Sequence, residues 1–146
     1  MIETINFDEL QWLHILNPEE EDYTYLLDNY NFHPLDIEDC RAINQRPKID
    51  EYDDYYFLIL HFPYLDKSNK FIRMKEVKIF WGKDYIITIG RSHWAVKNLF
   101  KQTKDEKQQY NSSDELLYNI LDRLMVETYT LILRIGSEVD SINYDI

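Results

Sequence analysis

Three carboxylates stand where they could bind a divalent cation: Glu38 and Asp39 on a short predicted helix, and Asp122 on a long one. Hard cations such as Mg²⁺ prefer oxygen ligands, and Mg²⁺ usually keeps several waters while it contacts one or two carboxylates. Adjacent helical residues point about 100° apart, so Glu38 and Asp39 can address two directions from one helix. Asp122 interrupts an apolar run, where an acid is costly unless it is paired or exposed. Each acid alone is weak evidence, because surface acids are common, and together the three residues only suggest a site for a divalent cation.

The sequence lacks the signatures of the common enzyme classes. Its three glycines are isolated, so no glycine-rich phosphate loop can form, and no G-x-S-x-G motif occurs. The four histidines are scattered and give little support for a zinc site. Cys40 with His33 could suggest a thiol nucleophile, but a buried small hydrophobe is the favoured interpretation of Cys40. The side chains of Glu38 and Asp39 point in different directions from adjacent helical positions, so they make a poor acid and base pair across one bond. We therefore expect that the protein is not an enzyme.

The net charge of −11 is distributed unevenly along the chain. Residues 17–54 carry twelve acidic and three basic side chains, whereas residues 67–109 carry four acidic and eleven basic ones. The basic side chains are dispersed among strand-like residues, so they do not make the concentrated basic face that nucleic acid requires. Solvated surface is the ordinary explanation of the acids, but an acidic N-terminal third also fits cation binding.

Targeting signals are missing, so a cytoplasmic location is expected. The longest apolar runs are far shorter than the ~20 residues that span a bilayer. Residues 1–7 lack the basic and apolar regions of a secretory signal. The single cysteine, Cys40, cannot form an internal disulfide and fits a reducing compartment.

Strands and helices alternate along the first two thirds of the chain, which predicts an α/β layered domain. Four strands are expected, at Gln11–Leu16, Tyr55–Phe62, Phe71–Trp81 and Tyr85–Ile89, and the last two should form a hairpin. Helices are expected after Asn17-Pro18, from His33-Pro34, and over Ala95–Phe100. In the second helix, Leu35 and Ile37 should face inward and Asp36, Glu38 and Asp39 should be more exposed.

A long C-terminal helix begins with the capping box formed by Ser112 and Glu115. Its apolar residues recur at spacings of three and four, at Leu117, Leu121, Leu124, Leu131, Ile135, Val139 and Ile142. A helix of this length extends on the order of 50 Å, whereas a compact body of this size is about 40 Å across. We therefore predict a body over residues 1–111 and the start of a stalk helix over residues 112–146.

As a whole, the sequence resembles the CorA family of Mg²⁺/Co²⁺ transporters. The matching stretches are FHPLDIEDC (32–40), RPKIDEYDDYYFLIL (46–60), EVKIFWGKDYIITI (76–89) and SSDELLYNILDRLMVETYTLILRIGSEVDSI (112–142). They occur in the order and at about the spacing typical of the family, and their combination is specific.

The resemblance implies an α/β/α sandwich, in which a mixed β-sheet lies between helices and is followed by a stalk helix that leads to two transmembrane helices. It also implies a homopentamer whose soluble domains lie on the cytoplasmic face of the inner membrane. In this family, divalent ions such as Mg²⁺ or Co²⁺ bind between protomers and favour the closed pore. By motif the regulatory carboxylates are Glu38, Asp39 and Asp122, with a further partner beyond Ile146. The Gly-Met-Asn pore signature would also lie beyond Ile146.

Two alternatives stay open from the sequence. A ZntB-like zinc transporter shares the overall pattern, and transport assays with competing cations would separate it from a Mg²⁺ transporter. A free-standing soluble domain with a binding or scaffold role would show a stop codon soon after Ile146.

Overall fold

The computed structural model describes residues 1–68, 71–91 and 93–144, and within these ranges the chain forms six strands and four helices. In chain order they are β1 (Ile2–Phe7), β2 (Leu10–Leu16), α1 (Glu20–Asn29), α2 (Pro34–Arg41), β3 (Lys48–Glu51), β4 (Tyr55–Asp66), β5 (Phe71–Gly82), β6 (Tyr85–Gly90), α3 (Trp94–Asp105) and α4 (Ser113–Tyr144).

The six strands form one mixed sheet in the order β1-β2-β6-β5-β4-β3. β2 pairs with β6 in parallel, with Trp12 opposite Ile86, while the other neighbouring pairs are antiparallel. β5 and β6 form the predicted hairpin, in which Trp81 lies opposite Ile86. The sequence prediction of a mixed sheet is confirmed.

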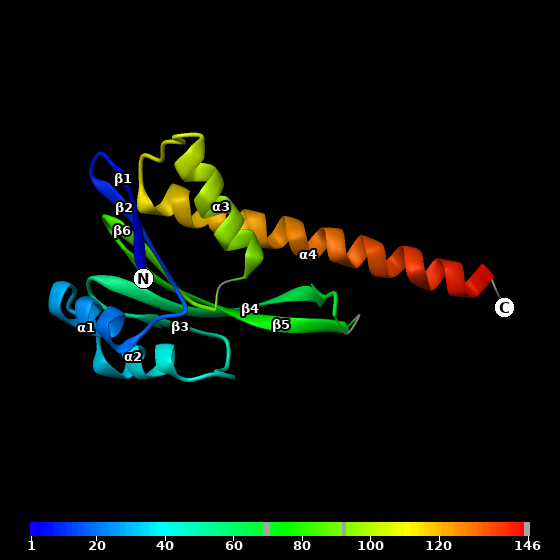
Figure 1. Ribbon diagram of the computed structural model, residues 1–146, viewed down its shortest axis with the longest axis horizontal. Coiled ribbons are helices and arrows are strands. Elements are labelled where there is room, and N and C mark those ends of the chain that lie inside the picture. Colours follow the sequence, from blue (N-terminus) through cyan, green and yellow to red (C-terminus); the bar gives the residue numbers. More distant parts are fainter. Residues whose placement is uncertain (69–70, 92, 145–146) are drawn as a thin grey trace.

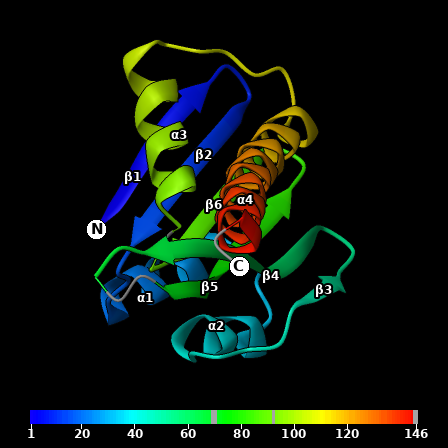
Figure 2. The ribbon, with the colours of Figure 1, turned by 90° about the vertical axis from the view of Figure 1, so that its right-hand side faces the viewer.

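Helices cover both faces of this sheet. α1 and α2 lie on one face, and α3 with the first turns of α4 lies on the other (Figures 1 and 2). The chain therefore has the α/β layered fold that its strand and helix patterns predict, in the α/β/α arrangement that the family resemblance implies.

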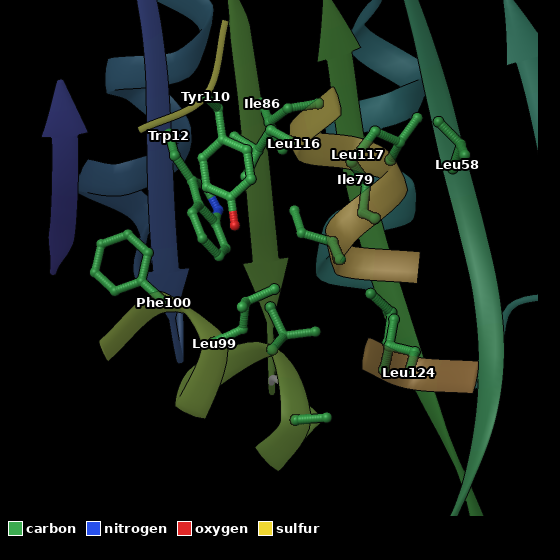
Figure 3. Packing of buried hydrophobic residues seen from close by; sticks show 14 of the residues in the cluster. Trp12, Leu58, Ile79, Ile86, Leu99, Phe100, Tyr110, Leu116, Leu117 and Leu124 are labelled. Carbon is green, nitrogen blue, oxygen red and sulfur yellow. The ribbon is translucent and has the colours of Figure 1, made fainter. Parts of the chain in front are cut away.

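Two apolar clusters, one on each face, hold the layers together. Because successive strand residues point to opposite faces, Trp12 packs under α3 and α4 while its neighbour Leu13 packs under α1 and α2. β4 behaves in the same way, with Leu58 in the first cluster and Phe57 in the second. The continuous apolar run of β4 thus reflects burial on both faces. Figure 3 shows the first cluster, in which Phe100 of α3 lies beside Trp12.

The long helix α4 begins at Ser113, one residue after its predicted cap. The Oγ of Ser112 accepts a hydrogen bond from the backbone N–H of Glu115 at 3.2 Å, as the capping box requires. The Glu115 carboxylate, however, accepts from the N–H of Asn111 at 2.9 Å and not from that of Ser112. The Glu115 carboxylate therefore bonds one residue earlier than a capping box predicts. The backbone N–H groups of Asn111 and Glu115 both have acceptors.

Only the first turns of α4 belong to the packed body. Leu116, Ile120 and Leu124 are fully buried against the sheet, whereas Met125 and Val126 are more than half exposed. From there the helix runs away from the other elements to its C-terminal end (Figure 1). Its 32 residues correspond to roughly 48 Å at 1.5 Å per residue. The helix therefore extends well past the body, as its length predicted.

Candidate functional site

The local sequence at residues 33–34 determines where helix α2 begins. His33 occupies the N-cap, and its Nδ1 accepts a hydrogen bond from the backbone N–H of Leu35 at 3.1 Å. Pro34 follows at the first helical position, where its missing N–H is not needed. This start places Glu38 and Asp39 in the second half of the helix, on the face of the sheet that α1 also covers.

Asp39 already has a cationic partner within the chain. The Nζ of Lys48 lies 2.6 Å from one Asp39 carboxylate oxygen and 2.8 Å from an Asp50 oxygen. The hydrogen bonds that Lys48 donates, first to Asp39 and then to Asp50, raise the pKa of Lys48. The three groups together carry one excess negative charge. A divalent cation at Asp39 would therefore share the carboxylate with Lys48 or displace its ammonium.

Glu38 differs from Asp39 in being exposed and unpaired. Within the described residues its carboxylate makes no hydrogen bond or ion pair, and it points away from Asp39 because the two are adjacent on a helix. No group of three or more His, Cys, Asp or Glu side chains in the described ranges is arranged to hold a metal ion. Among the described residues, one copy of the chain thus offers the exposed Glu38 at this place, together with Asp39 and Asp50, which share the Lys48 ammonium.

Asp122 lies in a different layer of the molecule. It is exposed on α4, and the sheet separates α4 from α2 (Figure 2). A single ion cannot contact Asp122 and Asp39 of the same copy. The three sequence-predicted residues are therefore not brought together within one chain.

Asp36 is a buried acid that the sequence did not reveal. The prediction that Asp36 would be exposed and Leu35 buried is wrong, since Asp36 is 1% exposed and Leu35 is 58% exposed. The Asp36 carboxylate accepts hydrogen bonds from the hydroxyls of Tyr52, at 2.9 Å, and Tyr55, at 2.7 Å. Burial raises the pKa of Asp36, and the two tyrosine hydrogen bonds oppose this shift. Asp36 fixes α2 to β4 and is not accessible to an ion.

Cys40 completes the inner face of α2. It is buried as predicted, and burial raises the pKa of its thiol to about 12. A thiol with such a pKa remains protonated at neutral pH, so it is a poor nucleophile and a poor metal ligand. This supports the interpretation of Cys40 as a packing residue.

Comparison with known proteins gives a family for nearly the whole chain. The family model described as CorA-like Mg²⁺ transporter protein matches residues 7–146. The candidate metal ion transporter YfjQ of Bacillus subtilis is 31% identical over 138 residues, and the cobalt/magnesium transport protein CorA of Thermotoga maritima is 23% identical over 143 residues. These alignments cover 90% and 92% of this chain but only 40% of each relative. The chain thus spans about 40% of the length of these two curated relatives.

Solved structures have the same fold. The complete CorA magnesium transporter of Methanocaldococcus jannaschii superposes with a TM-score of 0.77 at 18% identity, covering 97% of this chain and 45% of that one. The ZntB cytoplasmic domain of Vibrio parahaemolyticus superposes with a TM-score of 0.69 at 20% identity, covering 92% and 54%. No helix in the described ranges is both long and apolar enough to cross a membrane. The chain belongs to the family of CorA-like Mg²⁺ transporter proteins, which are transporters and not enzymes.

Proposed function

We propose that this chain is the cytoplasmic, ion-sensing domain of a divalent cation transporter, and that Mg²⁺ bound between protomers of a pentamer favours the closed pore. The family match over residues 7–146 carries this proposal. Co²⁺ or another divalent cation of similar chemistry is a further ligand of the same site. The division into a body over residues 1–111 and a stalk from residue 112 is part of the proposal.

The outer half of α4 supports a role as a stalk. Beyond Leu124 it exposes a series of large apolar side chains, namely Met125, Val126, Tyr129, Ile132, Leu133, Ile135, Val139 and Ile142. A helix with an apolar stripe and no body to pack on requires another surface to cover it. Neighbouring stalks in an oligomer would provide such a surface and would connect the body to a membrane part.

The placement of the acids supports a site between copies. Glu38 and Asp39 lie in one layer and Asp122 in the other, so an ion that uses both layers needs carboxylates from two chains. Acidic surfaces that face each other across a subunit boundary repel unless a cation bridges them. Loss of Mg²⁺ would then loosen the ring and shift the population toward open states.

The Lys48 ammonium should lower the affinity of this site for Mg²⁺. Mg²⁺ must compete at Asp39 with a cation that is already 2.6 Å from the carboxylate. Because Mg²⁺ also keeps most of its waters, a low affinity follows, which suits a sensor of an abundant intracellular ion. A tight site would remain occupied at all physiological concentrations and could not report them.

We expect the reading frame to continue past the codon for Ile146. The continuation should encode the rest of the helix and two apolar segments of ~20 residues, with Gly-Met-Asn between them. Sequencing the gene beyond this codon is the test. A stop codon directly after it would exclude a transporter and favour a free-standing binding or scaffold domain.

Transport assays with competing cations separate the remaining alternative. In cells whose Mg²⁺ uptake depends on this protein, Co²⁺ should compete with Mg²⁺ at lower concentration than Zn²⁺ does. Uptake of Zn²⁺ that excess Mg²⁺ leaves unchanged would favour the ZntB-like function instead. The fold is common to both, so the structure does not distinguish them.

A further inference from the structure

A cavity of about 930 Å³ opens where the parallel strands β2 and β6 both end. Asn17 and Pro18 follow β2, and Gly90 closes β6 with a φ of 122°, which glycine adopts readily. The segment at the C-terminal end of α2 and the outer part of β5 form the remaining walls. In open α/β sheets, ligands bind outside the carboxyl ends of parallel strands, and pockets of about 300–1,000 Å³ hold small organic molecules.

The charge of this cavity is opposite to that of the whole chain. One carboxylate, Glu76, lines it together with five cationic side chains, which are Arg41, Arg73, Lys75, Lys78 and Arg91. The net charge of the protein is −11. Positive charge that remains uncompensated at a concave surface attracts anions.

Contacts within the chain leave part of this positive charge available. Arg41 is held by Glu20 through two hydrogen bonds, and Arg73 lies 3.0 Å from an Asp66 oxygen. By contrast, Lys75 and Arg91 have no carboxylate partner among the described residues. The ammonium of Lys75 lies over the ring of Tyr64, 5.5 Å from its centre, which leaves the charge uncompensated by an anion.

Lys78 lines the part of the cavity next to α2, on the opposite face of β5 from Lys75, and it is paired with Glu76. It is 5% exposed, and its Nζ donates to the Ala42 carbonyl at 2.7 Å while lying 3.3 Å from a Glu76 oxygen. A buried ammonium is retained only where such partners stabilise it. Because the Glu76 carboxylate compensates this ammonium, Lys78 adds little to the net positive charge of the cavity.

We propose that this cavity binds a soluble, phosphate-bearing molecule of nucleotide size, with Lys75 and Arg91 as its direct partners. Guanidinium and ammonium groups are the side chains that bind phosphate most strongly, and the volume exceeds what a single inorganic phosphate would fill. A lipid headgroup is the other source of phosphate, but the site is recessed and the rest of the chain would be repelled by an anionic membrane. The site is distinct from Glu38, Asp39 and Asp122.

Isothermal titration calorimetry of the chain with ATP, pyrophosphate and adenosine tests this site. EDTA is present throughout, so that binding does not depend on a divalent cation or on the proposed metal site. We expect ATP and pyrophosphate to bind and adenosine not to bind. The variants Lys75→Glu and Arg91→Glu should each weaken ATP binding about tenfold or more, since each reverses one charge close to the phosphates.

Lys101→Glu is the matched control, because it makes the same charge change at an exposed position of α3 outside the cavity. It should leave the affinity for ATP within about twofold, and the melting temperatures of all three variants should match the wild type. Absence of ATP and pyrophosphate binding at low ionic strength would overturn the proposal. Equal weakening by Lys101→Glu, or binding to phosphatidylglycerol vesicles without binding to pyrophosphate, would overturn it as well.

Discussion

Replacing Trp12 with alanine is expected to lower the free energy of unfolding by about 3–5 kcal/mol. Trp12 is fully buried on the inner strand β2, its ring lies edge-on to Phe100 at 4.9 Å, and its Nε1 donates to the Thr88 hydroxyl at 3.1 Å. The substitution removes the largest side chain of the cluster in Figure 3 and leaves a cavity between the sheet and α3. Equilibrium unfolding in urea measures the change.

Trp94→Ala provides a control of the same chemistry. Trp94 begins α3 but is 47% exposed, so its removal should cost less than about 1 kcal/mol. If the two substitutions destabilised the chain equally, the assignment of Trp12 to the core beneath α3 and α4 would be wrong.

Acidification from pH 6.5 to 4 is expected to destabilise the chain through His14. The pKa of His14 is lowered to about 4, mainly by burial, while Glu3 opposes this shift and Lys97 adds to it. The Nδ1 lies 2.8 Å from the Thr88 hydroxyl, whereas the buried Nε2 has no partner among the described residues. The unfolded chain, in which the pKa is about 6.5, therefore binds a proton that the folded chain resists.

The sign of the effect follows from this difference. Stability is unaffected by His14 above pH 7, and it falls as the pH drops through 6.5 toward 4, by up to roughly 3 kcal/mol. Other groups also titrate in this range, so the measured quantity is the difference between the wild type and His14→Gln across the pH range. As the pH is lowered, the free energy of unfolding of the wild type should fall more than that of the variant. Parallel stability curves for the two proteins would show that His14 does not titrate in this way.

The sequence predicted the inner strands better than the edge strands. β2, β4, β5 and β6 are rich in aromatic and β-branched residues because they are covered by helices. β1 (IETINF) and β3 (KIDE) lie at the two edges and were not predicted. Edge strands tolerate polar and charged residues, and these two exist because a neighbouring strand provides their hydrogen bonds. Such pairing depends on the tertiary structure, so local sequence patterns do not predict it.

The orientation of α2 shows a second limit. Leu35 and Ile37 are two residues apart, which is about 200° around a helix, so they could not both face inward. The buried face is instead that of Asp36, Ile37 and Cys40, with Asp36 satisfied by hydroxyls from a later part of the chain. A single buried acid can reverse the apparent apolar face of a short helix.

The cationic cavity depends on distant parts of the sequence. The basic residues of β5 are dispersed along the chain, and this still argues against a nucleic-acid surface. The fold nevertheless brings Arg41 from α2 and Arg91 from the end of β6 to the outer part of β5. Charge counts along the sequence could not reveal this cluster, because it forms only when β2 and β6 pair in parallel.

Protection of the full-length transporter by Mg²⁺ against limited proteolysis tests the ion-sensing claim most directly. The wild type and the control Asp28→Asn, which removes an exposed acid on the neighbouring helix α1, should both become resistant as Mg²⁺ is added. For Asp39→Asn we expect this protection to be lost, or to need at least about tenfold more Mg²⁺, because the carboxylate that a bridging ion would contact is gone. Unchanged protection in Asp39→Asn would contradict the proposed site between protomers.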